Sequence, residues 1–294
     1  MNIRPKKFAL FGNVYQAKKS ANVLRLLSIL SKHQAEVYIQ KEFYQFLTKD
    51  QKMDIQAAGV FENDDFSADM VLSMGGDGTF LKAASYVGNK NIPILGINTG
   101  RLGFLADVSP EEMEETFEDI YKGNYKIEDR SVLHVFSEGQ PLKGYPYGLN
   151  EIAVLKRDSS SMITIHTSIN GAYLTTYQAD GLVIATPTGS TAYSLSAGGP
   201  VIDSRVKCIC ITPICPHSLT LRPIIFPDNS VIDIKYPAQR EKKLYLTIDG
   251  RKNVELFFGD KVSITKSNRI PHLIRLKKHS FYTKLQDKLG SVGS

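Results

Sequence analysis

Hydrophobic residues in the first 128 positions form short apolar runs that alternate with amphipathic segments. Runs with the length of buried strands lie at 7–13, 36–39, 68–72 and 91–97. Segments with apolar residues at helical spacing lie at 20–30, 80–87 and 109–122. Residues 48–67 carry weak periodicity and several charges, which predicts a loop with about one helical turn. Strands alternating with helices indicate an open parallel sheet in an α/β layer structure.

The pattern changes near residue 129, where short apolar runs follow one another without helical segments between them. Strands are expected at 131–136, 148–155, 162–169, 173–177, 182–186, 207–212, 224–225, 231–236, 244–249, 254–258 and 261–265. Turn signals such as Asn170-Gly171 and Asp249-Gly250 join them, which predicts an antiparallel β-sandwich. We therefore expect an α/β domain over 1–128 and a β-rich domain over 129–279. Residues 280–294 should hold a helix that packs back on the first domain.

The stretch from Ser73 to Leu81, with the sequence SMGGDGTFL, stands between a predicted strand and a predicted helix. A glycine-rich turn at a helix N-terminus lets backbone N–H groups converge on an anion. Asp77 is unusual there, because a carboxylate repels phosphate unless it holds a metal or accepts a proton. The stretch therefore predicts phosphate chemistry and not only phosphate binding. A second glycine-containing turn, residues 98–105, also follows a strand, and ligands of open α/β sheets bind at this edge.

Three further segments carry candidate chemistry. Asn150-Glu151 precedes a strand and offers a donor and acceptors that suit a ribose diol or an adenine edge, although a plain turn is the alternative. The segment 179–200 is dense in glycine and small hydroxyl residues, which fits either a nucleotide-lined site or a long surface loop. The segment 246–251 is interpreted as a hairpin turn.

Composition limits the classes of function. The net charge of +6 fits an anionic ligand, but the basic residues are scattered, which disfavours nucleic acid as a partner. Without a long apolar run or a signal peptide, we expect a cytoplasmic protein that does not bind membranes. Cys208, Cys210, Cys215 and His217 have the wrong spacing for a zinc knuckle, so buried thiols and no protein metal site are expected. Hydride-transfer and P-loop fingerprints are missing from the sequence.

Taken in order, these motifs resemble the NAD kinase family. The similarity rests on Gly75-Gly76-Asp77-Gly78-Thr79, the turn at 98–105, Asn150-Glu151, the run from Asp180 to Gly199 and the segment 212–219. The first motif alone is shared with diacylglycerol and sphingosine kinases. The ordered set covers the chain from about residue 70 to 258 and is far more specific.

The resemblance implies ATP-dependent phosphorylation of the 2′-hydroxyl of the adenosine ribose of NAD, which gives NADP. It implies a Rossmann-like α/β domain and a β-sandwich-like domain with the site in the cleft between them, and homotetramers. Asp77 would be the general base, and a divalent cation, Mg²⁺ by expectation, would bridge the ATP phosphates. Residues implied to bind substrate are Gly78, Asn150, Glu151, Asp180, Thr191, Ala192, Tyr193, Ser194, Leu195 and Ser196. Gln178 stands where many relatives carry Arg, and Lys82 could contact phosphate or solvent.

Two other interpretations remain open at this point. A lipid kinase with the same glycine turn would need a membrane-facing apolar surface and would leave Asn150-Glu151 and Asp180-Gly181 unexplained. A non-catalytic nucleotide-binding regulator would give Asp77 no proton to accept. Formation of NADP from NAD and ATP distinguishes the kinase from both.

Overall fold

The structure is a computed structural model, and it describes residues 5–14, 20–100, 103–137, 144–157, 161–237, 244–256, 260–276 and 280–289. The chain divides into two compact units. The first comprises Met1–Asp129 and Pro271–Ser294, and the second comprises Arg130–Ile270. The second unit therefore ends earlier than the expected range 129–279, because the strand that follows it pairs with the first sheet.

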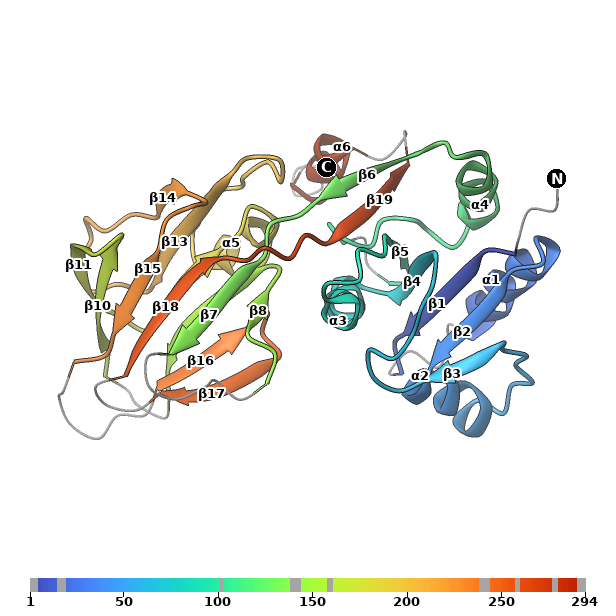
Figure 1. Cartoon of the computed structure of the whole chain (residues 1–294). Helices are drawn as coiled ribbons and strands as arrows, with labels where there is room; N and C mark the ends of the chain where they lie inside the picture. Colours follow the sequence, from blue (N-terminus) through green and yellow to red (C-terminus); the bar gives the residue numbers. More distant parts are fainter. Residues whose placement is uncertain are drawn as a thin grey trace. The chain divides into compact units, whose positions relative to one another are not determined.

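The first unit is an α/β unit built on one sheet (Figure 1). Within the described ranges its strands are β1 (Lys7–Gly12), β2 (Glu36–Gln40), β3 (Gly59–Phe61), β4 (Met70–Gly75), β5 (Ile94–Asn98), β6 (Tyr125–Asp129) and β19 (His272–Leu276). They lie in the order β3-β2-β1-β4-β5-β19-β6. All neighbouring pairs are parallel except β19 with β6. The predicted parallel sheet is confirmed, with one antiparallel strand added at its edge.

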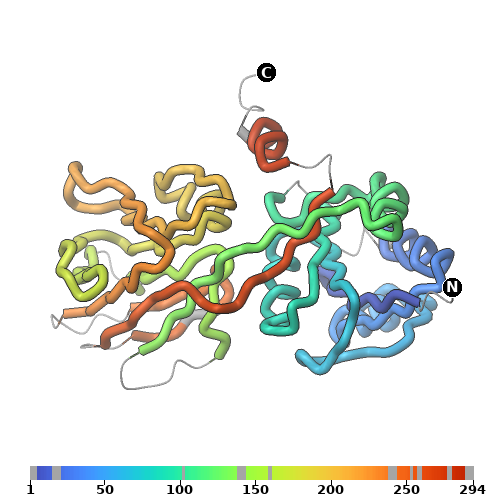
Figure 2. Tube along the Cα trace, turned by 45° about the horizontal axis from the view of Figure 1, so that its top comes forward, coloured from blue at the N-terminus to red at the C-terminus, as the bar shows by residue number. Residues whose placement is uncertain are grey.

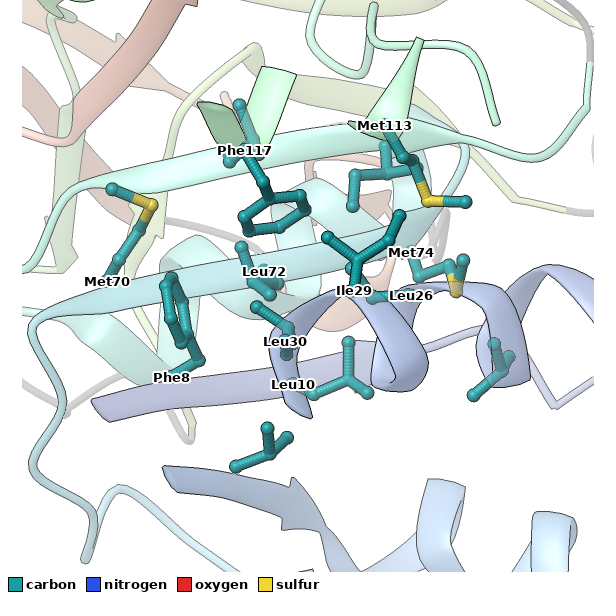
Figure 3. Packing of buried hydrophobic residues seen from close by; sticks show 14 of the residues in the cluster. Phe8, Leu10, Leu26, Ile29, Leu30, Met70, Leu72, Met74, Met113 and Phe117 are labelled. Atoms are coloured by element: carbon teal, nitrogen blue, oxygen red, sulfur yellow. The ribbon is translucent and has the colours of Figure 1, made fainter. Parts of the chain in front are cut away.

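Helices cover both faces of this sheet. They are α1 (Ser20–Lys32), α2 (Lys41–Gln45), the π-helical turn η2 (Phe46–Asp50), α3 (Asp77–Val87), α4 (Met113–Lys122) and α6 (Phe281–Leu289). On one face, apolar side chains of α1 and α4 pack on alternate residues of β1 and β4, such as Phe8, Leu10 and Leu72 (Figure 3). Phe11, the residue after Leu10, points to the other face, where its ring packs edge-on against Tyr86 of α3. Because successive side chains of β1 point to opposite faces, this strand contributes apolar residues to the packing on each face of the sheet.

Two parts of the first unit differ from the expectation. Residues 48–67 were expected as a loop with about one helical turn; the π-helical turn that extends to Asp50 fits this, but Gly59–Phe61 forms a strand that pairs with β2. Strands β6 and β19 were not expected, and they run side by side from His272↔Asp129 to Leu276↔Tyr125 (Figure 2). Both strands are short, and β6 exposes Ile127, so neither has a clean apolar run.

The second unit consists of two antiparallel sheets. In the described ranges the strands are β7 (Leu133–Ser137), β8 (Tyr147–Gly148), β9 (Glu151–Lys156), β10 (Ile163–Ile169), β11 (Ala172–Ala179), β12 (Gly181–Ala185), β13 (Cys208–Ile214), β14 (Ile224–Pro227), β15 (Ile232–Lys235), β16 (Leu244–Ile248), β17 (Lys252–Leu256) and β18 (Lys261–Lys266). One sheet has the order β11-β10-β15-β18-β7-β8 and the other β14-β13-β12-β9-β16-β17. Two short helices, η3 (Thr188–Thr191) and α5 (Tyr193–Ser196), follow β12.

One hydrophobic cluster joins the two sheets of the second unit. It contains inward-facing residues of β7, β10, β15 and β18 together with those of β9, β12, β13 and β16. Val135 and Ile264 come from one sheet, and Val154 and Ile184 from the other; all are fully buried. This shared core confirms the predicted sandwich. In the described part of the chain, no helix combines the length and hydrophobicity that a membrane span requires.

Candidate active site

The two glycine-rich turns of the first unit lie next to each other at one edge of the sheet. The first follows β4 and the second follows β5, and Gly75 pairs with Asn98 at the ends of these strands. β1 has β2 on one side and β4 on the other, so the order of the strands reverses between β1 and β4. Ligands of open α/β sheets bind at such a switch point. The sequence therefore placed both turns at the correct edge.

Asp77 is the first residue of α3, and its half-buried carboxylate reaches the second turn. Oδ2 accepts the N–H of Phe104 at 2.9 Å, and Oδ1 accepts those of Leu105 and Ala106 at 3.0 Å each. Successive backbone N–H groups of this kind form a cradle for an anion. They fix the orientation of the carboxylate. Since a carboxylate offers about four lone-pair positions, these three bonds leave one on Oδ2.

The glycines around Asp77 have two different tasks. A Cβ atom on Gly103 would lie 2.0 Å from Asp77 Oδ1, so only glycine allows the second turn to close on the carboxylate. A Cβ atom on Gly76 or Gly78 would meet nothing within 4 Å, and Gly78 is exposed. The open side of the turn is therefore the side from which a ligand can approach.

Lys82, one turn further along α3, lies against Glu42 of α2. Its Nζ is 2.5 Å from Glu42 Oε2, and both side chains are partly exposed. The hydrogen bond from Lys82 lowers the pKa of Glu42. A contact of Lys82 with phosphate stays a prediction, and it would compete with this ion pair.

In the second unit, the Asn150-Glu151 turn is held by the carboxylate of Asp249. Asp249 Oδ1 accepts the N–H groups of Asn150 at 2.7 Å and Glu151 at 3.2 Å, and Oδ2 accepts that of Leu149 at 3.1 Å. Asp249 is 8% exposed and has a positive φ of 50°. The sequence alone favoured a plain hairpin turn at 246–251, so this positioning role was missed. Only the pairing of β16 with β9 brings residue 249 to residue 150.

The carbonyl side of the same turn is held by the segment after β12. Thr186 Oγ1 donates to the carbonyl of Leu149 at 2.6 Å, and the N–H of Thr186 donates to that of Asn150 at 2.9 Å. A Cβ atom on Gly189 would lie 2.0 Å from the Asn150 carbonyl oxygen, so glycine allows this close approach. Asn150 is thus fixed from both sides of its backbone.

Glu151 is a buried carboxyl group with an unused acceptor. It is 5% exposed, and its Oε2 has no hydrogen-bond partner among the described residues. Burial, and then the charge of Asp249, raise the pKa of Glu151 to about 7, while a hydrogen bond from the backbone N–H of Tyr193 opposes this rise. Near neutral pH the protonated and the ionised forms of this carboxyl group are therefore both populated.

The segment from Thr191 to Ser196 divides into residues that face outward and residues that pack inward. Tyr193 is 37% exposed, and Ser196 is exposed too. Thr191, Ala192 and Leu195 are half-buried. Ser194 is fully buried, and its Oγ lies 2.9 Å from Thr212 Oγ1 on β13. Ser194 therefore anchors the segment, and Tyr193 presents a ring at the surface.

Asp180 lies just before β12, at the end of the β9–β12 pair opposite to Glu151, whereas Gln178 lies on β11 of the other sheet. The register pairs Ala185 with Glu151 and Gly181 with Leu155, so the two ends are about 13 Å apart. Lys156 Nζ donates a hydrogen bond to Asp180 Oδ1 at 2.6 Å. Gln178 is exposed on β11.

Burial raises the pKa of the Tyr193 phenol, and the neighbouring Cys215, Glu151 and Asp180 add smaller electrostatic contributions in the same direction.

The three cysteines lie on β13 and directly after it. Cys208 and Cys210 are buried, as expected, and burial raises the pKa of both thiols. Cys215 is exposed, which corrects the expectation that it is buried, because it follows the end of β13 with a φ of 45°. Among the described residues, no group of three His, Cys, Asp or Glu side chains has the arrangement of a metal site.

Comparison with known proteins defines the class. The model of the ATP-NAD kinase N-terminal domain matches residues 8–125, and that of the ATP-NAD kinase C-terminal domain matches residues 149–276. An NAD kinase of Bacteroides fragilis is 53% identical over 96% of this chain and 97% of its own length. One from Porphyromonas gingivalis is 40% identical over 97% of both chains. The chain therefore belongs to the NAD kinase family, the ATP-dependent phosphotransferases that act on an alcohol group of NAD.

Solved structures agree with this assignment. A yeast NADH kinase in complex with NADH matches with a TM-score of 0.87 and 25% identity, over 100% of this chain and 90% of its own. An NAD kinase from Archaeoglobus fulgidus in complex with ATP matches with a TM-score of 0.73 and 26% identity, over 97% of this chain and 98% of its own. The fold predicted from the sequence, an α/β unit followed by a β-rich unit, is that of this family.

Proposed function

We propose that this chain transfers the γ-phosphoryl group of ATP to the 2′-hydroxyl of the adenosine ribose of NAD, with Asp77 as the general base. The observation that carries the proposal is the state of the Asp77 carboxylate. Three backbone N–H groups orient it, and among the described residues no second donor occupies Oδ2, which leaves a lone pair for a hydroxyl proton. Because the phosphoryl-transfer transition state is loose, orientation of the hydroxyl matters more than a strong base.

The second unit supplies the polar groups for NAD in this proposal. The unpaired Oε2 of Glu151 offers an acceptor that a ribose hydroxyl or an adenine amino group satisfies. Tyr193 offers an exposed ring for stacking. Asn150, whose backbone is held by Asp249 and Thr186, is proposed to contribute its side-chain amide. Asp180, Gln178 and the remaining residues of the segment 191–196 are proposed to contact other parts of the dinucleotide.

Magnesium is proposed to arrive as part of the MgATP substrate. Asp77 already accepts three hydrogen bonds, and the described residues hold no carboxylate cluster that would form a cage. This fits an ion that keeps its waters and is bound mainly through the phosphates of a nucleotide. On the family resemblance alone, we further propose that the chain is cytoplasmic and forms a homotetramer. Light scattering of the purified chain tests the oligomeric state.

The experiment is to incubate the purified chain with NAD, ATP and Mg²⁺ and to identify the product by ³¹P NMR. We expect a 2′-phosphate monoester resonance on the dinucleotide and an equal amount of ADP. Release of ADP without a phosphorylated dinucleotide would contradict the proposed acceptor. Omission of Mg²⁺ with added chelator should abolish both products.

A further inference from the structure

The loop that binds the Asp77 carboxylate through its N–H groups is itself held by hydrogen bonds to its carbonyl groups. We call residues 103–107 the anchor loop, since its N–H groups bind the Asp77 carboxylate. Its carbonyl groups accept hydrogen bonds from two cations near the end of the chain. Arg275 donates to the carbonyl of Phe104 at 2.9 Å and to that of Leu105 at 3.4 Å, and Lys284 donates to the carbonyl of Phe104 at 3.1 Å.

These cations act on the same peptide groups that bind Asp77. The carbonyl of Phe104 and the N–H of Leu105 form one peptide group, and the carbonyl of Leu105 and the N–H of Ala106 form the next. Both of these N–H groups donate to Asp77 Oδ1. A cation bound to the oxygen of a peptide group polarises its N–H bond and strengthens the hydrogen bond that this N–H donates. Cation, peptide and carboxylate therefore form one continuous chain of hydrogen bonds.

A buried carboxylate fixes the two cations in place. Asp107 is 4% exposed, and its Oδ2 lies 2.7 Å from Arg275 Nη1 and 2.5 Å from Lys284 Nζ. Arg275 also pairs with Glu128 of β6, with Nε at 3.3 Å from Oε2. Arg275 and Lys284 are themselves 7% and 5% exposed. Buried charges with several partners have little freedom to move, so the anchor loop is held rigidly.

Arg275 and Lys284 come from β19 and α6, which follow the whole second unit in the sequence. Their contacts give α6 a reason to pack on the first unit beyond the burial of its apolar face. The helix carries a lysine that reaches the anchor loop. A surface helix that served only to cover the sheet would not need a buried cation there.

We propose that Lys284 and Arg275 are positioning residues that orient the Asp77 carboxylate for catalysis through the peptide groups of the anchor loop. This inference rests on the proposed role of Asp77. Loss of Lys284 should leave substrate binding intact and slow the chemical step, because the cations contact the anchor loop and not the groups proposed to hold NAD.

The test compares Lys284→Met with Lys288→Met in the full-length chain. Lys288 lies one turn further along α6 and contacts the ring of the same Phe104, with Nζ 4.7 Å from its centroid. Both variants remove one charge from one helix, but only the first removes a bond to the anchor-loop carbonyl. We expect kcat to fall about ten- to a hundredfold for Lys284→Met, with the KM for NAD and for ATP within about threefold of wild type. Lys288→Met should keep the wild-type kcat, and Lys284→Arg should restore most of it.

Hydrogen exchange provides a second measurement that does not depend on activity. In the unliganded full-length chain, the amides of Leu105 and Ala106 should exchange about tenfold faster in Lys284→Met than in Lys288→Met. Equal exchange and equal kcat in the two variants would overturn the inference, and so would a loss confined to KM. If Asp77→Asn were fully active, the proposed function would fail instead, whatever the lysine variants show.

Discussion

Glu151 provides a direct test of how burial and charge shape the site. Its carboxyl group is buried next to Asp249, and these two influences raise its pKa from 4.5 to about 7. Glu151→Gln keeps the size of the side chain and, like the protonated acid, offers one donor group and one acceptor oxygen, but it removes the titration. The comparison of the two proteins therefore isolates the free energy that ionisation of Glu151 costs the fold.

The sign follows from the direction of the shift. Between pH 4.5 and 7 the folded chain holds a proton on Glu151 that the unfolded chain has lost. The stability linked to this proton is complete below pH 4.5 and is lost as the pH rises through 7. A difference of about 2.5 pKa units at 1.36 kcal/mol per unit corresponds to about 3 kcal/mol. The free energy of unfolding of wild type, relative to Glu151→Gln, should fall by about this amount from pH 4.5 to pH 8.

Urea unfolding without nucleotides, at a series of pH values, measures this difference. Glu114→Gln serves as a control of opposite sign. Lys32 lowers the pKa of Glu114 through a hydrogen bond, so the stability that this group contributes is present above pH 4.5 and lost as the pH falls. Parallel pH profiles for wild type and Glu151→Gln would refute the account of a buried, protonated Glu151.

Two further substitutions test the second unit and the glycine turn. Asp249→Ala removes the acceptor of three backbone N–H groups, so the free energy of unfolding should fall by about 3 kcal/mol and the Kd for NAD should rise. Asp249→Asn should lower the free energy of unfolding by less. Equal stability of Asp249→Ala and wild type in urea unfolding would contradict this expectation. Gly78→Ala adds a methyl group in open space on a helix, so the midpoint of thermal unfolding should stay the same or rise, because Ala is favoured there by up to about 1 kcal/mol. If Gly78 borders the substrates as proposed, its turnover should nevertheless fall, and a fully active variant would remove Gly78 from the proposed site.

The sequence predicted the parts of this fold that repeat a regular pattern. The alternation of β1 and the helical spacing in α1 and α4 are local, so the α/β sheet and its two covered faces could be inferred before the structure. Strand β19 could not be inferred, because it is short and follows the second unit in the sequence. Only its pairing with β5 and β6 shows that it belongs to the first sheet. Its Arg275 and the Lys284 that follows it were consequently not recognised as neighbours of the glycine turn.

The site shows the same division between local and long-range information. The two glycine-rich turns were each found as motifs, but the bonds from the second turn to Asp77 join residues 27 to 29 positions apart. Asp249 acts on residues about 100 positions away, and its Asp-Gly turn looks ordinary in isolation. Contacts of this kind depend on strand pairing, which a motif does not encode.

The central claim is that the Asp77 carboxylate accepts the proton of the NAD hydroxyl, and Asp77→Asn tests it most directly. Single-turnover formation of NADP should be compared with wild type, with the Kd for NAD measured by calorimetry on the same samples. We predict a rate at least about a hundredfold lower and a Kd within about threefold, because the amide keeps the shape of the side chain but does not act as a base, and its NH2 group cannot accept the backbone N–H that the second carboxylate oxygen binds. A single-turnover rate equal to that of wild type, with unchanged binding, would contradict the account.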